Sequence, residues 1–267
     1  MTNPESNAEN HAAGGVRRHR RWAELFFQSR VTRQRIRRAI ADLSSGLRRC
    51  EKMHDGPYSM VVGESRSKLR SEDRPAEADF QHGKVQNLRI AAQELDCALL
   101  LPGQTFSFWM QIGRATEERG YVIGRMLQQG CMIPAIGGGL CQLSNALYDA
   151  ALQSGCEIVE RHAHSRIVPG SEAVAGRDAT VAWNYVDLRF RSRVPLLIRA
   201  QVTGDELVVS FCAFPGTVVP KERMADPGEH ASDPDAAQGR KLVASICGTC
   251  AEIGCLRHEN REKISLF

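Results

Sequence analysis

The sequence contains no long apolar run, no internal repeat and no leader-like N-terminus. No stretch reaches the ~18 apolar residues that a transmembrane helix requires. Residues 1–15 are polar and contain no apolar core that could serve as a signal peptide. These absences argue against a membrane-spanning protein and a repeat array, and they predict a cytoplasmic chain.

A disulfide framework is also missing. The nine cysteines are an odd number, spread without pattern through most of the chain and then clustered at 247, 250 and 255. A small secreted scaffold would be shorter and denser in cysteine. Buried thiols, one nucleophile and a metal site in a reducing compartment explain this usage better.

What the chain does have is the composition of an ordinary globular protein, with 42% hydrophobic and 25% charged residues. Its net charge of +4 is concentrated between residues 17 and 49, which are rich in arginine and include two acids, Glu24 and Asp42. Apolar residues recur there at roughly helical spacing. The helix could contact nucleic acid or anionic lipid, but a packed helix with a solvated arginine face is the more common outcome.

The chain is predicted to divide into five segments. These are disordered residues 1–15, a basic helical region and linker at 16–82, a core domain at 83–214, a linker at 215–240 and a small tail at 241–267. The loop or linker within the second segment is placed at 54–82.

Within the core, periodicity predicts helices over 83–101 and 142–154, and short strands and turns over 112–130. Strands are predicted over 105–109, 156–168 and 180–190, with a hairpin formed by 195–202 and 206–214. The expected fold class is α+β, with a helix packed on an antiparallel sheet, N-terminal helices and a metal-binding tail.

The most unusual local sequence is Gly137-Gly138-Gly139-Leu140-Cys141, directly before the second helix. Glycine allows a sharp turn and the close approach of a substrate chain. A cysteine in the first turn of a helix is near the positive end of the helix dipole, which favours the thiolate. Backbone N–H groups at the same place could stabilise an oxyanion. The pattern predicts a nucleophilic Cys141.

A nucleophile needs a base and a group that orients the base. His162 and His164 follow the helix on the next predicted strand, and Asp178 opens the strand after that. We expect His164 to be the base, with His162 as the alternate, and Asp178 to orient the imidazole. The order of Cys, His and Asp matches the triad logic of papain- and transglutaminase-like enzymes.

Two alternatives remain open for the glycine-rich segment. It could bind a phosphate, although it lacks the Lys-Ser/Thr ending of a P-loop. Cys141 could also be a small buried residue without a chemical role, which is common for free cysteine.

The motifs in combination resemble the VanW-like family. They are the runs 137–148, 160–165, 176–181 and 187–190, supported by 103–108 and 112–121, and the resemblance covers roughly residues 83–214. It implies a link to bacterial cell-wall physiology and glycopeptide resistance, and peptidoglycan-type peptides as a substrate class. Many members resemble exported proteins, whereas no export signal is evident here.

Further polar residues surround the expected triad. Gln142 is a candidate for lining a substrate pocket together with the three glycines. Arg161 and Arg177 could bind a substrate carboxylate in bidentate fashion. Each arginine could instead form a structural ion pair with Asp187 or Glu160.

The C-terminal tail offers Cys247, Cys250, Cys255 and His258 within twelve residues. Such a Cys3His set fits tetrahedral zinc, and the spacing is close to that of a zinc knuckle, which often binds single-stranded nucleic acid. An iron–sulfur cluster is the rival cofactor, and a thioredoxin-like redox pair a further alternative.

Three functions follow. The first is a VanW-like enzyme that uses Cys141 for acyl transfer or amide hydrolysis on peptide-like substrates. The second is a non-catalytic module that binds a peptide or an anion in the same cleft. The third is a zinc-containing regulatory protein that contacts nucleic acid or a protein partner.

Overall fold

The computed structural model describes residues 29, 32–33, 35–70, 78–128, 131–164, 166–167, 177–219 and 241–242. These fall into two units that divide between Leu47 and Arg48. In the first unit residues 35–44 are helical. The predicted zinc ligands of the tail lie outside the described residues.

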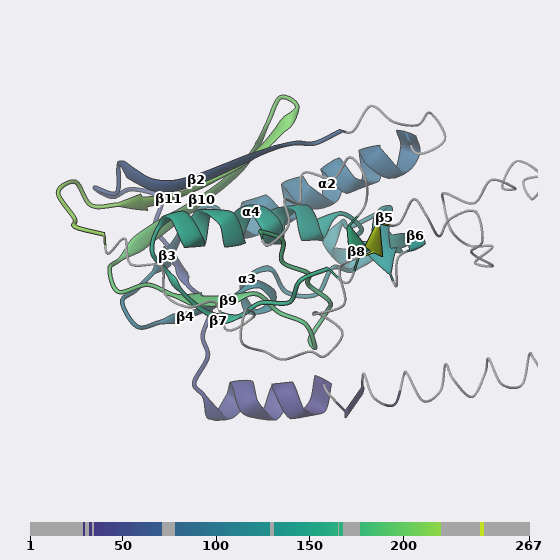
Figure 1. Ribbon diagram of the computed structural model, residues 1–267, viewed down its shortest axis with the longest axis horizontal. Coiled ribbons are helices and arrows are strands. Elements are labelled where there is room, and N and C mark those ends of the chain that lie inside the picture. Colours follow the sequence, from purple (N-terminus) through teal and green to yellow (C-terminus); the bar gives the residue numbers. More distant parts are fainter. Residues whose placement is uncertain are drawn as a thin grey trace, which may run out of the picture. The chain divides into compact units, whose positions relative to one another are not determined.

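The second unit is a mixed α+β structure (Figure 1). Its helices are α2 (Ala78–Leu95), α3 (Phe108–Ile112), the 3-10 turn η2 (Glu117–Arg119) and α4 (Leu140–Gln153). Its strands are β1 (Glu51–Lys52), β2 (Met60–Lys68), β3 (Ala98–Leu100), β4 (Thr105–Ser107), β5 (Ile123–Gln128), β6 (Cys131–Ile136), β7 (Glu157–Glu160), β8 (Arg166–Ile167), β9 (Arg189–Arg191), β10 (Leu196–Thr203), β11 (Glu206–Ala213) and β12 (Lys241–Leu242).

The largest sheet has five strands in the order β1-β3-β10-β11-β2, and every neighbouring pair is antiparallel. A second antiparallel sheet has the order β4-β9-β7, and β5 pairs with β6 in a two-stranded ribbon. β8 and β12 form a short parallel pair. The predicted α+β class with antiparallel sheets is therefore confirmed.

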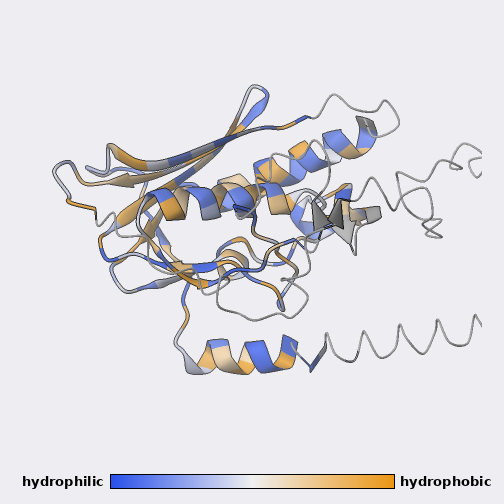
Figure 2. Ribbon diagram, in the orientation of Figure 1, coloured by the Kyte–Doolittle hydropathy of each residue, from blue (hydrophilic) through white to orange (hydrophobic). Residues whose placement is uncertain are grey.

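Helix α4 lies between the two antiparallel sheets. It packs against β2 and β11 of the five-stranded sheet and also contacts β7, while α2 packs against β10 and α4 (Figure 1). Orange and blue residues alternate around both helices in Figure 2, as expected for helices with one buried face. Phe190 of β9 stacks on Phe106 of the neighbouring strand β4 at 4.5 Å between ring centroids. Its ring also lies 5.6 Å from that of Phe211 in β11, so an aromatic contact joins the two sheets.

The hairpin and the helix after Cys141 are confirmed. β10 and β11 pair from Leu197–Cys212 to Thr203–Glu206, and Gly204 in the turn has φ 59°. Helix α4 ends at Gln153, and Gly155 just beyond it adopts the left-handed conformation (φ 64°) common at helix ends.

The predicted loop at 54–82 is wrong, because it contains β2 and the start of α2. β2 is an edge strand whose sequence, Met-Val-Val-Gly-Glu-Ser-Arg-Ser-Lys, is largely polar. Such strands face solvent on one side and give a weak hydrophobic signal. The helix predicted over 83–101 begins earlier, at Ala78, and ends at Leu95, after which β3 begins.

Three predicted strands are shorter than expected. Residues 108–112 form α3 rather than continuing β4, and β7 ends at Glu160. The run 180–190 turns at Asn184, which has φ 58°, and only its end belongs to β9. Asp187 holds the chain where β4 gives way to α3. Its carboxylate accepts hydrogen bonds from Ser107 Oγ (2.6 Å) and Trp109 N (3.2 Å) at the start of this helix.

In the described ranges, no helix combines the length and the apolar character needed to cross a bilayer.

Candidate active site

The three glycines make the tight turn that leads from β6 into α4. Gly139 is the N-cap of the helix and has φ 102°. A Cβ there would lie 2.1 Å from Cγ of Lys84, a buried residue of α2. A Cβ on Gly138 would lie 2.3 Å from the backbone carbonyl of Gly124 in β5. Internal packing thus explains the need for glycine at both positions, and contact of Gly137, Gly138 and Gly139 with a substrate stays a prediction.

Cys141 occupies the first turn of α4. Of the five cysteines whose side chains the structure describes, Cys50, Cys97, Cys156 and Cys212 are buried and Cys141 is half-buried. Burial raises the pKa of Cys50 and of Cys156 to about 12. The Cys141 thiol lies 3.9 Å from the carbonyl oxygen of Val181. It is therefore the most accessible thiol of this set, and it lies against the segment that contains Asp178.

Two side chains of α4 fix that segment beside the helix. The hydroxyl of Ser144 donates to the carbonyl of Ala179 at 2.6 Å, and the Ala179 N–H donates to Oδ1 of Asn145 at 2.8 Å. Both backbone groups of one residue are thus held by adjacent side chains of α4. The sequence alone does not indicate these contacts, because no periodicity or motif links positions 34 or 35 residues apart.

Asp178 and His164 form a close pair. His164 Nδ1 lies 2.8 Å from Oδ2 of the buried Asp178, and the backbone N–H of His164 donates to the same oxygen at 2.6 Å. These two bonds fix both the position and the rotation of the imidazole. With Nδ1 engaged, Nε2 is the ring atom left for chemistry.

His164 also interacts with the thiol of Cys141. Burial by itself lowers the pKa of the ring, but hydrogen bonds with Asp178 and with Cys141 outweigh burial, and the pKa of His164 is raised to about 9. A histidine with this pKa carries a positive charge at neutral pH. The structure thus brings three of the four predicted catalytic side chains, Cys141, His164 and Asp178, into one chain of contacts.

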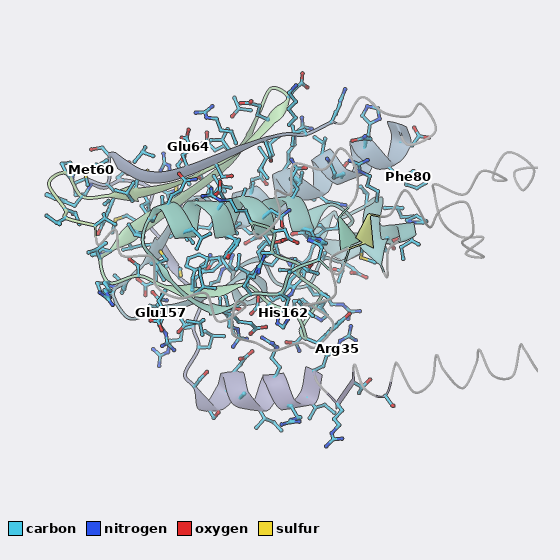
Figure 3. The ribbon with its side chains drawn as sticks, viewed as in Figure 1. Arg35, Met60, Glu64, Phe80, Glu157 and His162 are labelled. Carbon is cyan, nitrogen blue, oxygen red and sulfur yellow. The ribbon has the colours of Figure 1, made fainter. Side chains whose placement is uncertain are left out.

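His162 is not part of this chain. Its Nε2 lies 3.1 Å from Oε1 of Glu160, and about half of its side chain is exposed (49%). Both histidines come after the end of β7, so the expected strand does not set their directions. Figure 3 labels His162 together with Glu157, the first residue of β7. The geometry favours His164 over His162 as the partner of the thiol.

The residues expected to bind substrate are engaged within the protein. The side-chain amide of Gln142 donates to Ser67 Oγ and to the carbonyl of Lys68, both at 2.8 Å. Arg161 forms an ion pair with Asp178 at 3.0 Å, and Arg177 forms one with Asp149 of α4 at 2.6 Å. The partners that the structure gives these arginines are thus Asp178 and Asp149, whereas Asp187 and Glu160 were the structural partners considered from the sequence.

Asp187 and Glu160 instead share Arg189. Its Nε lies 2.8 Å from Oδ2 of Asp187 and 3.5 Å from Oε2 of Glu160. Burial raises the pKa of Asp187. This network holds β9 to the start of α3.

No metal centre is found in the part of the chain that the structure describes, where no three His, Cys, Asp or Glu side chains gather around a common point. The predicted ligands Cys247, Cys250, Cys255 and His258 are outside that part. Zinc binding by the tail therefore stays a prediction.

Comparison with known proteins places the site in a family context. A family model described as "VanW like protein" matches residues 83–212. The uncharacterized protein YoaR of Bacillus subtilis (strain 168) is 36% identical over 130 residues, which are 48% of this chain and 42% of YoaR. The vancomycin B-type resistance protein VanW of Enterococcus faecalis (strain ATCC 700802 / V583) is 34% identical over 132 residues, which are 48% of this chain and 47% of that protein.

The matched region thus spans less than half of each of these relatives. No solved structure matches the chain. The matched segment contains most of α2, the whole of α4 and all three members of the Cys141–His164–Asp178 chain of contacts. Residues 83–212 of this protein therefore belong to the VanW-like family.

Proposed function

We propose that the VanW-like segment is a cysteine-dependent hydrolase or acyltransferase that acts on amide bonds of peptidoglycan-type peptides. One observation carries the proposal: His164 contacts both the Cys141 thiol and the buried Asp178 carboxylate. A nucleophile, a proton carrier and an orienting acid in this order are what covalent acyl transfer requires. The order of Cys on a helix N-terminus followed by His and Asp also supports the proposed papain- or transglutaminase-like arrangement.

In the proposed reaction the Cys141 sulfur attacks the carbonyl carbon of the substrate amide. The C–N bond then breaks, the amine leaves with the proton from Nε2 of His164, and a thioester remains on Cys141. A water molecule that passes its proton to the now neutral His164 would hydrolyse the thioester, and an amine in its place would give acyl transfer. Asp178 keeps Nδ1 protonated throughout.

The start of α4 supports this chemistry. The first N–H groups of a helix have no acceptor within the helix. The N–H of Gln142 donates to the Gly139 carbonyl at 3.0 Å. In the proposed reaction the N–H groups of Leu140 and Cys141 bind the developing oxyanion. The helix dipole favours negative charge at the same position.

The substrate class rests on similarity alone. One relative carries the name of a vancomycin resistance protein. We extend that association with glycopeptide resistance to peptidoglycan-type peptides because they contain amide bonds suited to a thiol nucleophile.

The test is incubation of the full chain with soluble peptidoglycan fragments, followed by mass spectrometry of both fragments and protein. We expect loss or exchange of an amide-linked group, and a mass increase on Cys141 in rapidly quenched samples. C141S and H164Q should abolish both signals. Unchanged fragments, together with alkylation of Cys141 no faster than that of free glutathione, would exclude the proposed enzyme.

A further inference from the structure

Arg161 is almost wholly buried at the back of the proposed triad. Its side chain is 6% exposed, and its guanidinium makes two contacts with the same residue. Nη2 donates to the carboxylate Oδ1 of Asp178 at 3.0 Å, and Nε donates to the Asp178 backbone carbonyl at 2.8 Å. An arginine in this position is not available to a substrate carboxylate.

The ring of Tyr148 holds the guanidinium from the other side. The Arg161 guanidinium carbon lies 5.1 Å from the centre of this ring, within the range of a cation–π interaction. Tyr148 is a buried residue of α4, the helix that begins with Leu140 and Cys141. One helix therefore presents the thiol at its start and fixes the arginine two turns later.

We infer that Arg161 is a positioning residue, whose charge and planar fork keep Asp178 ionised and oriented so that His164 and Cys141 persist as an imidazolium–thiolate pair before any substrate binds. The inference rests on the proposed function, because the ion pair matters only if Cys141 is a nucleophile.

The electrostatic reason lies in the burial of Asp178. A buried carboxylate without a cation tends to become protonated, since the charged form is poorly solvated there. Arg161 and His164 both pair with the Asp178 carboxylate, and His164 in turn interacts with Cys141. Positive and negative groups thus alternate from the Arg161 guanidinium to the Asp178 carboxylate and the His164 imidazolium, and the Cys141 sulfur comes next in the row. Removing the Arg161 charge makes the ionised form of Asp178 less favourable, and the protonated form of His164 less favourable in turn.

Arg177 provides a matched control. It precedes Asp178 directly in the sequence, yet its guanidinium pairs with Asp149 and about half of its side chain is exposed (52%). Arg161→Gln and Arg177→Gln therefore remove the same charge from positions that differ in contact with the Asp178 carboxylate.

The experiment records two readouts on the full chain without substrate. The first is the NMR titration of the His164 ring nitrogens, assigned by comparison with H164Q. The second is the rate of iodoacetamide alkylation of Cys141 between pH 5 and pH 10. We expect R161Q to lower the His164 midpoint by at least about one pH unit and to slow alkylation at pH 6 about tenfold, the change that corresponds to one unit. R177Q should behave as wild type in both readouts, and R161K should retain part of the upward shift of the His164 midpoint.

Several results would overturn the inference. In R161Q, lower thermal stability with both pH profiles unchanged would show a purely structural role. In R161K, a His164 midpoint as low as in R161Q would show that the charge is not responsible. Should R161Q fail to fold, the wild-type titration decides, because a His164 midpoint at or below about 6.5 contradicts the ion pair. These measurements need no turnover, so an inactive protein in which R161Q but not R177Q lowers the His164 midpoint would reject the proposed function and leave the positioning role of Arg161 in place.

Discussion

His164 and Asp178 are fourteen positions apart in the chain, and Nδ1 of one lies 2.8 Å from Oδ2 of the other. The second bond to the same oxygen, from the His164 backbone N–H at 2.6 Å, means that the carboxylate holds the main chain as well as the ring. The imidazole is therefore aimed before a substrate arrives. Preorganisation of this kind is what distinguishes a catalytic histidine from a surface one.

The two histidines should respond differently to substitution. At pH 7 we expect H164Q to slow alkylation of Cys141 roughly 10- to 30-fold, because an ordinary cysteine is only a few per cent thiolate at that pH. H162Q should leave the rate within about twofold, since His162 pairs with Glu160 and not with the thiol. The measurement is site-resolved mass spectrometry after timed iodoacetamide exposure. Equal rates in H164Q and wild type would show that the imidazole does not activate Cys141.

His164 should also make stability depend on pH. Its pKa is raised to about 9, against an ordinary value near 6.5, so the folded state binds the proton more tightly than the unfolded state. The stabilisation is complete below about pH 6.5 and is lost as the pH rises through about 9. Between pH 6 and pH 10, the gap in unfolding free energy between wild type and H164Q should narrow by up to about 3 kcal/mol.

Urea denaturation in the presence of a reductant, at several pH values, measures this gap. D178N is the informative companion, because it removes the carboxylate that accepts from Nδ1. Its free energy of unfolding should depend on pH in the same way as that of H164Q. A gap that stays constant over the pH range would mean that His164 does not gain its proton in the folded state.

Much of this arrangement could be predicted from the sequence. The helix after Cys141, the hairpin at 195–214 and the antiparallel α+β class depend on local periodicity and turn residues, which a single sequence records well. The pairing of His164 with Asp178 followed from the types of residue that a thiol nucleophile needs. The sequence favoured His164 as the base with His162 as the alternate, and the irregular path of residues 161–164 is what brings His164 to Asp178 and His162 to Glu160.

The rest depends on contacts that leave no local pattern. Edge strand β2 is polar, so it reads as a loop although it completes the five-stranded sheet. Ser144 and Asn145 hold Ala179 through backbone groups, and such bonds do not constrain the identity of the residue that they hold. Arg161 suggested substrate binding because a charged residue near a site is usually exposed, whereas the fold buries it against Asp178.

Gly139 offers a test of the turn before Cys141. Alanine at this position must adopt φ 102°, and its Cβ must displace the stem of the buried Lys84, which would lie at 2.1 Å. Gly103→Ala is the matched control, because Gly103 has φ 75° and no atom within 4 Å of an added Cβ. Both variants suffer backbone strain, and only G139A suffers the clash. The free energy of unfolding of G139A should therefore be about 1–3 kcal/mol lower than that of G103A.

Urea denaturation monitored by tryptophan fluorescence measures the difference, and Trp109 and Trp183 in the folded unit, whose rings contact each other, provide the signal. If the two variants are equally stable, Lys84 is able to move aside and the tight packing of the turn against α2 is not required.

The C-terminal tail should bind one zinc ion per chain. Three thiolates and an imidazole at 247, 250, 255 and 258 satisfy the tetrahedral preference of zinc, and so short a segment gains most of its folding energy from the metal.

Elemental analysis of the full chain, purified without added chelator, should find about one equivalent of zinc, and the chain ending at residue 240 should contain none. C250S should lose the metal without changing alkylation of Cys141, because the proposed activation of that thiol comes from His164. Iron with an equal amount of sulfide and a brown colour would show that the tail binds an iron–sulfur cluster and not zinc. A full chain without any metal would show that the four residues are ordinary thiols and an imidazole.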